Sequence, residues 1–223
     1  MDRTITWQSP HHGEIAPESG FAERYEDLGL IAQGGMGEVR RVRDRQLGRV
    51  VAMKILAIDR IQSMGTAARF VAEATITAQL VHPGIIAVFD RGERSGTLWY
   101  TMTEVRGATL AQRILASRGS PDGLRSLVQI LHRVCEAIAY AHSEGVIHRD
   151  LKPDNIMVGP FGEVLVMDWG IACKLAEPAG AAGTPGWVAP EQARGETPAP
   201  QADIYALGGV LHAFLMGGPQ PLR

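Results

Sequence analysis

Two oxygen-bearing side chains flank a short predicted hairpin in the sequence, and their types suit a magnesium site. Asn155 comes directly before one apolar run and Asp168 directly after a second, with Gly159-Pro160-Phe161-Gly162 between the runs. Gly and Pro between β-branched residues favour a turn, so Ile156–Val158 and Val164–Met167 are predicted to pair as antiparallel strands. Antiparallel pairing would bring Asn155 and Asp168 together, and Mg²⁺ favours such oxygens, completed by water and phosphate.

Asp150 and Lys152 lie on the loop that leads into this hairpin, where both side chains can face the same metal-bound group. The segment 146–170 is therefore predicted to be a site of phosphoryl transfer. The alternative is a chance loop and hairpin whose charged side chains are simply solvated.

A lysine and a glutamate stand out within apolar patterns nearer the N-terminus. Lys54 lies in the predicted strand Gly48–Leu56, and Glu73 lies on the apolar stripe of a helix predicted over Thr66–Leu80. Because a buried ion needs a partner, pairing of Lys54 with Glu73 would explain both positions. The alternative for Lys54 is an edge-strand position from which its amine reaches water.

A glycine-rich segment, Gln33-Gly34-Gly35-Met36-Gly37, separates strands predicted over Leu28–Ile31 and Glu38–Val42. Glycines let backbone N–H groups approach phosphate oxygens without a Cβ in the way. Such loops are commonly just tight hairpins, but the position of this one directly before the Lys54 strand favours a phosphate-binding role.

Two further strands and two helices are predicted downstream. The strands cover Ile85–Asp90 and Leu98–Thr103, and the helices cover Gly107–Ser117 and Leu124–His142. The longer helix has apolar residues at helical spacing, so one of its faces should be buried. Cys135 lies on that face and is predicted to be a core residue.

The composition is that of an ordinary globular protein, with 223 residues, 45% hydrophobic and 21% charged. A formal net charge of −2 gives no sign of a nucleic-acid partner, and no apolar run approaches the ~20 residues of a membrane span. Two cysteines without a spacing pattern suit a reducing compartment, so a cytoplasmic location is expected. Residues 1–20 lack a signal-peptide pattern and are expected to be a flexible extension.

Four motifs resemble those of the protein kinase family, and they follow one another along the chain in the same order as in that family. His148–Asn155 resembles its catalytic loop, and Asp168-Trp169-Gly170 resembles its metal-binding D-F-G motif, with Trp in place of Phe. Val51-Ala52-Met53-Lys54 is similar to V-A-I-K, and Gly183–Glu191 is similar to the substrate-docking segment that ends in A-P-E. The sequence is therefore identified as similar to bacterial eukaryotic-like serine/threonine protein kinases.

The glycine-rich segment matches the family pattern G-x-G-x-x-G-x-V with one departure. Gly34, Gly37 and Val39 match, whereas Ala32 occupies the position of the first glycine. The extra methyl group is expected to stiffen the loop and to weaken nucleotide binding without abolishing it.

The resemblance implies a bilobal α+β fold with a small β-rich N-lobe that carries one helix and a mainly helical C-lobe. The kinase domain would cover residues 25–223, with the N-lobe at 25–103 and the C-lobe at 106–223. Relatives continue with several more helices, so the C-lobe is expected to be truncated at its C-terminus. A chain ending there would be marginally stable, would pair with a partner or a second copy, or would be a fragment of a longer protein.

The resemblance also implies a set of catalytic roles. Asp150 would accept the proton of the substrate hydroxyl, and Lys152 would steady the γ-phosphate. Lys54, braced by Glu73, would hold the α- and β-phosphates of ATP. Thr184 would bond the catalytic aspartate and lysine and support the site for a protein serine or threonine.

The cofactors implied are ATP and Mg²⁺, the metal being held by Asn155 and Asp168. Met102 would be the gatekeeper beside adenine, while the Thr103 carbonyl and the Val105 N–H would bond its edge. The apolar strand residues among the nucleotide-binding residues are equally compatible with a plain core role. The implied nucleotide-binding residues are Ile31, Ala32, Gly34, Gly37, Val39, Ala52, Lys54, Met102, Thr103, Val105 and Met157.

Thr184 is the only hydroxyl-bearing residue between Asp168 and Glu191, so no separate phosphorylation site remains in this expected mobile activation segment. Arg149, which in relatives often pairs with a phosphate there, would lack that partner. Activity independent of phosphorylation in this segment is therefore predicted. Two other function classes stay open, an ATP-binding or pseudokinase interaction module and, disfavoured by the A-P-E match, a small-molecule phosphotransferase.

Overall fold

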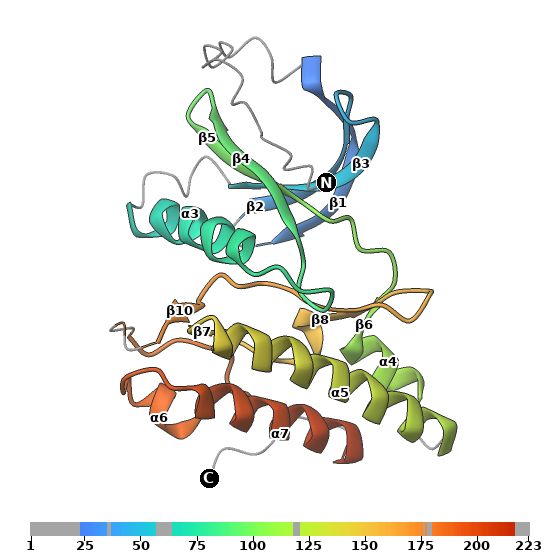
Figure 1. Cartoon of the computed structure of the whole chain (residues 1–223), viewed down its shortest axis with the longest axis vertical. Helices are drawn as coiled ribbons and strands as arrows, with labels where there is room; N and C mark the ends of the chain where they lie inside the picture. Colours follow the sequence, from blue (N-terminus) through green and yellow to red (C-terminus); the bar gives the residue numbers. More distant parts are fainter. Residues whose placement is uncertain are drawn as a thin grey trace, which may run out of the picture.

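The computed structural model describes residues 23–34, 37–56, 64–117, 121–175, 177 and 180–216. In these residues a β-rich lobe stands above a mainly helical lobe (Figure 1). The predicted α+β fold with two lobes is confirmed. The expected extension at residues 1–20 and the chain end at 217–223 lie outside the described residues.

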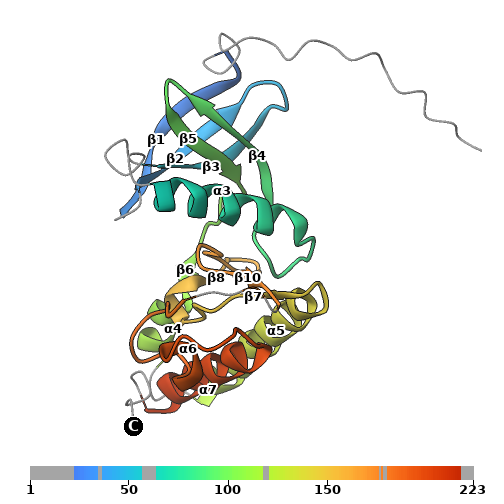
Figure 2. The same ribbon diagram turned by 90° about the vertical axis from the view of Figure 1, so that its left-hand side faces the viewer.

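The upper lobe is an antiparallel five-stranded sheet with one helix on its face, in the order β1-β2-β3-β5-β4. Figure 2 shows the helix lying against the sheet, where the Phe70 ring packs on the Tyr100 ring at 5.1 Å between centroids. The opposite face carries a smaller buried cluster around Met53 and Trp99. The elements are β1 (Tyr25–Gly34), β2 (Gly37–Asp44), β3 (Arg49–Leu56), α3 (Met64–Gln79), β4 (Val88–Arg94) and β5 (Thr97–Met102).

The lower lobe is built on two long helices that lie side by side, α5 (Pro121–Ser143) and α7 (Pro200–Met216). Above them run the short strands that carry the predicted hairpin, in a sheet of order β6-β8-β9 and a pair β10-β7. No helix within the described residues is long and apolar enough to cross a lipid bilayer. The remaining elements are β6 (Ala108–Thr109), α4 (Leu110–Ala116), β7 (Val146–Ile147), the 3-10 helix η1 (Pro153–Asn155), β8 (Ile156–Val158), β9 (Val164–Val166), β10 (Cys173–Lys174) and α6 (Pro190–Ala193).

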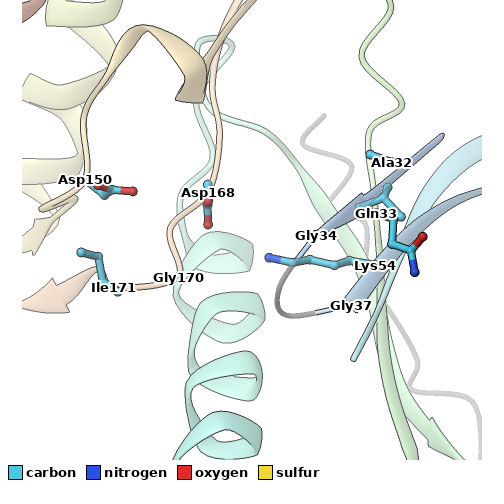
Figure 3. Close-up of a pocket in the computed structure, with 10 residues that line it drawn as sticks. Ala32, Gln33, Gly34, Gly37, Lys54, Asp150, Asp168, Gly170 and Ile171 are labelled. Atoms are coloured by element: carbon cyan, nitrogen blue, oxygen red, sulfur yellow. The ribbon is translucent and has the colours of Figure 1, made fainter. Parts of the chain in front are cut away.

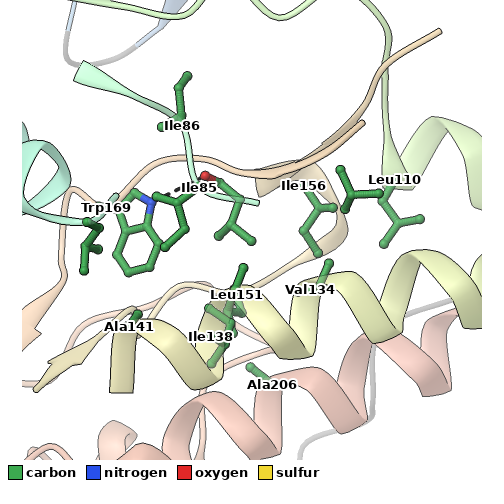
Figure 4. Packing of buried hydrophobic residues seen from close by; sticks show 14 of the residues in the cluster. Ile85, Ile86, Leu110, Val134, Ile138, Ala141, Leu151, Ile156, Trp169 and Ala206 are labelled. Carbon is green, nitrogen blue, oxygen red and sulfur yellow. Dashed lines mark hydrogen bonds between the residues drawn. The ribbon is translucent and has the colours of Figure 1, made fainter. Parts of the chain in front are cut away.

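The largest buried cluster fills the lower lobe beneath the hairpin. Val134 and Ile138 from α5 face Leu151 of the following loop and Ile156 of β8 (Figure 4). Val134, Leu151 and Ile156 are fully buried. The loop and hairpin that carry the candidate site therefore rest on close-packed apolar side chains, which resist displacement.

The strand predicted to begin at Ile85 begins instead at Val88, and that prediction is wrong by three residues. Residues 84–86 bond to β9 of the lower lobe, because the Val166 N–H donates to the Gly84 carbonyl (2.8 Å) and the Ile86 N–H to the Val166 carbonyl (3.2 Å). Ile85 is buried in the same cluster as the lower-lobe core. This stretch therefore joins the lobes and does not extend the upper sheet.

The helix predicted to begin at Gly107 begins at Leu110, because Thr109 caps it. The Thr109 hydroxyl accepts from the Gln112 N–H, and the Gln112 side chain accepts from the Thr109 N–H, which forms a capping box. Gly107 has φ +153°, and a Cβ there would lie 2.2 Å from the Val158 carbonyl oxygen. Only glycine permits β6 to approach β8 so closely.

Cys135 is exposed, so the prediction that it belongs to the core is wrong. The buried stripe of α5 instead includes Ile130 and Ala137, while Val128 is exposed. Adjacent helical residues differ by about 100° in direction, so a modest rotation of the stripe moves Cys135 from the core to the surface.

Candidate active site

The loop that carries Asp150 is held from below by a buried aspartate. Asp203 of α7 is completely buried and accepts the backbone N–H groups of His148 (2.9 Å) and Arg149 (2.8 Å). His142 Nε2 lies 2.8 Å from the same carboxylate. Arg149 has φ +70°, a left-handed conformation that costs a non-glycine residue about 1–3 kcal/mol. The bond from Asp203 helps to hold that conformation.

The His148 ring links the catalytic loop to the end of β9. Its Nδ1 accepts the Asp150 N–H at 3.2 Å, so the ring proton sits on Nε2 and is donated to the Met167 carbonyl at 3.0 Å. The Trp169 ring packs on His148 at 4.5 Å between centroids, and its Nε1–H donates to the Val166 carbonyl (Figure 4). Trp169, at the Phe position of the family motif, is thus a buried anchor beside Asp168.

Asp150 stands at the centre of a hydrogen-bond network that joins three predicted site residues to it. The Thr184 hydroxyl donates to Asp150 Oδ1 at 2.6 Å, and Lys152 Nζ donates to Asp150 Oδ2 at 2.9 Å and to Thr184 Oγ1 at 2.6 Å. Asn155 Nδ2 donates to the Asp150 carbonyl (2.9 Å) and to Oδ2 (3.2 Å). Together these donors hold the Asp150 carboxyl group in one orientation.

Asn155 and Asp168 meet at the open end of the hairpin. The Met167 N–H donates to the Asn155 carbonyl at 2.8 Å, which brings the two chain segments together. Asn155 uses its amide nitrogen on Asp150, so its side-chain oxygen is left for a cation, and Asp168 exposes its carboxylate with φ +58°. Two hard oxygen donors at the edge of a cavity fit Mg²⁺. In the described part of the chain no group of three or more His, Cys, Asp or Glu side chains forms a metal cage.

Lys54 and Glu73 form the ion pair that the sequence predicted, with 2.7 Å between Lys54 Nζ and Glu73 Oε1; Glu73 is buried and Lys54 is partly buried. The Tyr100 hydroxyl, on the strand paired with β3, donates to the same oxygen at 2.7 Å. Burial, the negative charge of Glu73 and this hydrogen bond all raise the pKa of Tyr100. Glu73 Oε2 is buried without a partner among the described residues, and a Cβ at Gly170 would lie 3.3 Å from it.

A cavity of about 430 Å³ lies between the lobes at this point. Lys54 extends from the sheet toward the side where Asp150 and Asp168 lie (Figure 3). The β1–β2 ribbon forms the opposite wall, with Ala32 paired to Val39 and Gly34 paired to Gly37. Gly35 and Met36 lie outside the described residues. The lining residues are Ala32, Gln33, Gly34, Gly37, Val39, Lys54, Asp150, Asp168, Gly170 and Ile171.

Of the residues predicted to surround adenine, Val39 lines this cavity, whereas Ala52, Met102, Thr103, Val105 and Met157 lie outside its lining. Ala52 pairs with Met102 across β3 and β5, and both side chains are buried. The Thr103 N–H donates to the Ala87 carbonyl at 2.9 Å. Val105 packs against the large core cluster. Met157 on β8 is half-buried, whereas Ile31 on β1 is exposed.

Arg149 uses its guanidinium on backbone carbonyls of the activation segment. Nη1 donates to the Ile171 carbonyl at 3.3 Å and Nη2 to the Gly180 carbonyl at 2.5 Å. The side chain expected to lack a phosphate partner thus has two neutral acceptors. Glu191 of α6 makes no ion pair among the described residues.

Two buried side chains of the site region were missed by the sequence analysis. Tyr100 could have been found from strand alternation, because it lies opposite Lys54 in the β3–β5 register. Gln192 of α6 donates to the backbone of the catalytic loop and of the activation segment. No local pattern singles out Gln192, since its partners are distant in sequence.

The fold and the site define a two-lobed protein. Lys54, ion-paired with Glu73, lies on one side of the cavity between the lobes. Asp150 and the oxygen-bearing side chains of Asn155 and Asp168 lie on the other side. The sequence pattern of the protein kinase domain matches residues 25–222, and the chain belongs to this family. It is 36% identical over 225 residues to the serine/threonine-protein kinase PknD of Chlamydia caviae, a match that covers 86% of this chain and 24% of that protein.

The serine/threonine-protein kinases PknB of Mycolicibacterium smegmatis and Mycobacterium leprae are 41% and 39% identical to this chain. Each match covers 89% of this chain and 33% of the relative. The chain therefore spans a quarter to a third of the length of these curated relatives. The predicted likeness to bacterial eukaryotic-like serine/threonine kinases is confirmed.

Proposed function

We propose that the chain is an ATP-dependent serine/threonine protein kinase in which Asp150 is the catalytic base. The observation that carries the proposal is the orientation of the Asp150 carboxylate by Thr184, Lys152 and Asn155 at the edge of the cavity that Lys54 enters. Catalysis of phosphoryl transfer depends mainly on positioning and electrostatic stabilisation, which is what this arrangement supplies.

In this mechanism the substrate hydroxyl donates its proton to Asp150 while its oxygen forms a bond to the γ-phosphorus of ATP. The bond from that phosphorus to the β–γ bridging oxygen breaks, and ADP leaves. Lys152, already 2.6 Å from Thr184 Oγ1, balances negative charge on the transferred group. Thr184 keeps Asp150 in one rotamer and forms part of the surface that receives the protein substrate.

Lys54 would bind the α- and β-phosphates, and the ion pair with Glu73 would keep the lysine ammonium group at the wall of the cavity. Asn155 and Asp168 would hold Mg²⁺, which when bound neutralises phosphate charge. The backbone of the β1–β2 ribbon would cover the phosphates, because Gly34 and Gly37 leave its N–H groups accessible. Met102, Thr103 and Val105 would surround the adenine.

The preference for serine and threonine over tyrosine rests on Lys152, two residues after Asp150, by analogy with the family. It agrees with the names of the three relatives above, each a serine/threonine-protein kinase. The two free cysteines suit a reducing compartment, so we place this activity in the cytoplasm.

The test is transfer of the γ-phosphate from radiolabelled ATP to a generic protein that exposes serine, threonine and tyrosine. Label is expected on serine and threonine after acid hydrolysis, and removal of Mg²⁺ with a chelator should stop the transfer. Asp150→Asn keeps the size and most hydrogen bonds of the side chain but removes the base, so transfer should fall by roughly 10²–10⁴-fold. Equal activity of this variant would exclude the proposed base.

Asp168→Ala examines the metal-binding residue separately. The side chain is exposed and makes no hydrogen bond or ion pair within the described residues, so thermal unfolding should be nearly unchanged while transfer is abolished. A wild-type chain that binds ATP by calorimetry but transfers no phosphate would instead favour a nucleotide-binding module, the function class that the Ala32 departure suggests.

A further inference from the structure

Gln192 is buried between two segments that meet at the candidate active site. Only 6% of the residue is exposed, and it lies in the short helix α6 that follows the activation segment. Its Nε2 donates to the Arg149 carbonyl at 2.6 Å and to the Ala182 carbonyl at 2.6 Å. A single amide group therefore uses both hydrogens to join the catalytic loop to the activation segment.

The two carbonyls belong to residues next to the reacting pair. Arg149 directly precedes Asp150, and Ala182 lies two residues before Thr184, which donates to Asp150 at 2.6 Å. Arg149 has φ +70°, and Asp203 Oδ1 already fixes its N–H group. Gln192 binds the carbonyl of Arg149, so both backbone polar groups of this strained residue are held by hydrogen bonds.

The junction leaves no room for a side chain on the activation segment. Gly183 has φ +124°, and a Cβ there would lie 2.9 Å from Gln192 Nε2 and 3.3 Å from the Arg149 carbonyl oxygen. A buried amide, two carbonyls and a glycine that permits their approach are the features of a built contact. Buried polar groups of this kind are costly when one partner is removed.

We infer that Gln192 is a positioning residue that sets the geometry of the Asp150–Thr184 pair by tying residue 149 to residue 182. This inference rests on the proposed kinase function, because its consequence is expressed in phosphoryl transfer. Gln192 does not line the cavity between the lobes, so its loss should impair the chemical step more than ATP binding.

Gln192→Met is the first variant, because methionine has a similar length and fills similar space but has no donors. We expect kcat to fall by roughly 10- to 100-fold, as for other small misplacements of catalytic groups, while the KM for ATP changes by less than about threefold. The matched control is Gln201→Met, at an exposed position of α7, which should match the wild type in both constants. An unchanged kcat in Gln192→Met would overturn the inference.

A second measurement does not depend on activity. Amide hydrogen exchange of residues 180–188 should be faster in Gln192→Met than in wild type and Gln201→Met, because the segment has lost its tie to residue 149. Equal exchange would refute the role of Gln192, even if the wild type transferred phosphate normally. If the wild type transfers no phosphate, the proposed function is wrong. The hydrogen-exchange measurement would still decide whether Gln192 holds residues 149 and 182 together.

Gln192→Glu provides a variant whose tie can be restored, should the methionine variant fail to fold. The ionised carboxyl cannot donate and faces two carbonyl oxygens, whereas the protonated form can donate one hydrogen bond. The charged side chains of the facing loop are Arg149, directed at the carbonyls of residues 171 and 180, and the ion-paired Asp150 and Lys152. Glu191 directly precedes position 192 in α6, and residues 180–184 have no ionisable side chain. Exchange, corrected for its intrinsic pH dependence, should approach the wild-type value as the pH falls from about 8 to 5.5. A difference that stays constant with pH would contradict the inference.

Discussion

At the scale of single residues, the Thr184 hydroxyl is the most sharply testable group of the site. It receives a hydrogen bond from Lys152 and donates one to Asp150, both at 2.6 Å. Thr184→Ala removes the hydroxyl and lets both charged side chains move, so kcat should fall by roughly 10- to 100-fold. Thr184→Ser keeps the hydroxyl and should retain activity within about threefold of wild type. Steady-state kinetics of the two variants against one protein substrate decides the point, and equal losses would show that the methyl group matters more.

Tyr100 is the second residue whose loss has a defined consequence. Tyr100→Phe removes the hydrogen bond to Glu73 but leaves the Lys54–Glu73 ion pair in place. A hydrogen bond to a buried charged group contributes about 1.5–3 kcal/mol, so the free energy of unfolding should fall by about 2 kcal/mol, and KM for ATP should rise. Urea denaturation and ATP kinetics measure the two effects. Tyr140→Phe is the control, since the Tyr140 hydroxyl accepts the Val81 N–H, and neither residue lines the cavity between the lobes. This variant should lower stability without changing KM.

At the scale of elements, the β2–β3 turn offers a prediction that depends on pH. Burial alone would raise the pKa of Asp44, but the hydrogen bonds from Arg24 and from the backbone of Leu47 and Gln46 outweigh burial and lower it. A carboxyl whose pKa is lowered in the folded state stabilises the fold above its unfolded pKa of about 3.9, and this stabilisation is lost as the pH falls through the folded value.

Asp44→Asn should therefore lower the free energy of unfolding by about 1–3 kcal/mol at pH 7, because the ion pair with Arg24 is lost. The difference between variant and wild type should shrink as the pH falls from about 4 toward 2. Urea denaturation at several pH values measures it. A difference that is equally large at pH 2 would mean that the charge of Asp44 is not the cause.

The elements also show which parts of the site can be predicted from sequence. Local turn and strand patterns predict the hairpin and the lysine strand. The catalytic loop is predicted from its resemblance to the family motif, although Asp203, 54 positions away from Arg149, helps to hold it. The Gln192–Arg149 bond spans 43 positions and the Tyr100–Glu73 bond 27, so these contacts depend on strand register and on packing. The run of apolar residues at Ile85 predicts a strand, whereas the structure pairs Ile85 with Val166 of the other lobe.

At the scale of the whole molecule, the two lobes of the unmodified chain bring the site residues to one cavity. The upper lobe contributes the closed Lys54–Glu73 pair, and the lower lobe contributes Asp150 and Asp168 across one cavity. Arg149, the cation that would receive an activation-segment phosphate, instead donates to the carbonyls of residues 171 and 180. These contacts involve no phosphate, so we predict that the activation segment of the unmodified chain is ordered without phosphorylation.

From this arrangement we expect full activity in the unmodified chain. Protein produced with a broad-specificity phosphatase, and shown by intact mass to carry no phosphate, should have the kcat of untreated protein within about twofold, because no charge-assisted contact is removed. Arg149→Leu should instead impair both forms equally, since it leaves the two carbonyls without their donor. Activity that falls after phosphatase treatment and returns on incubation with ATP would show that a phosphate contact, and not the contacts of Arg149 with the backbone, organises the active molecule.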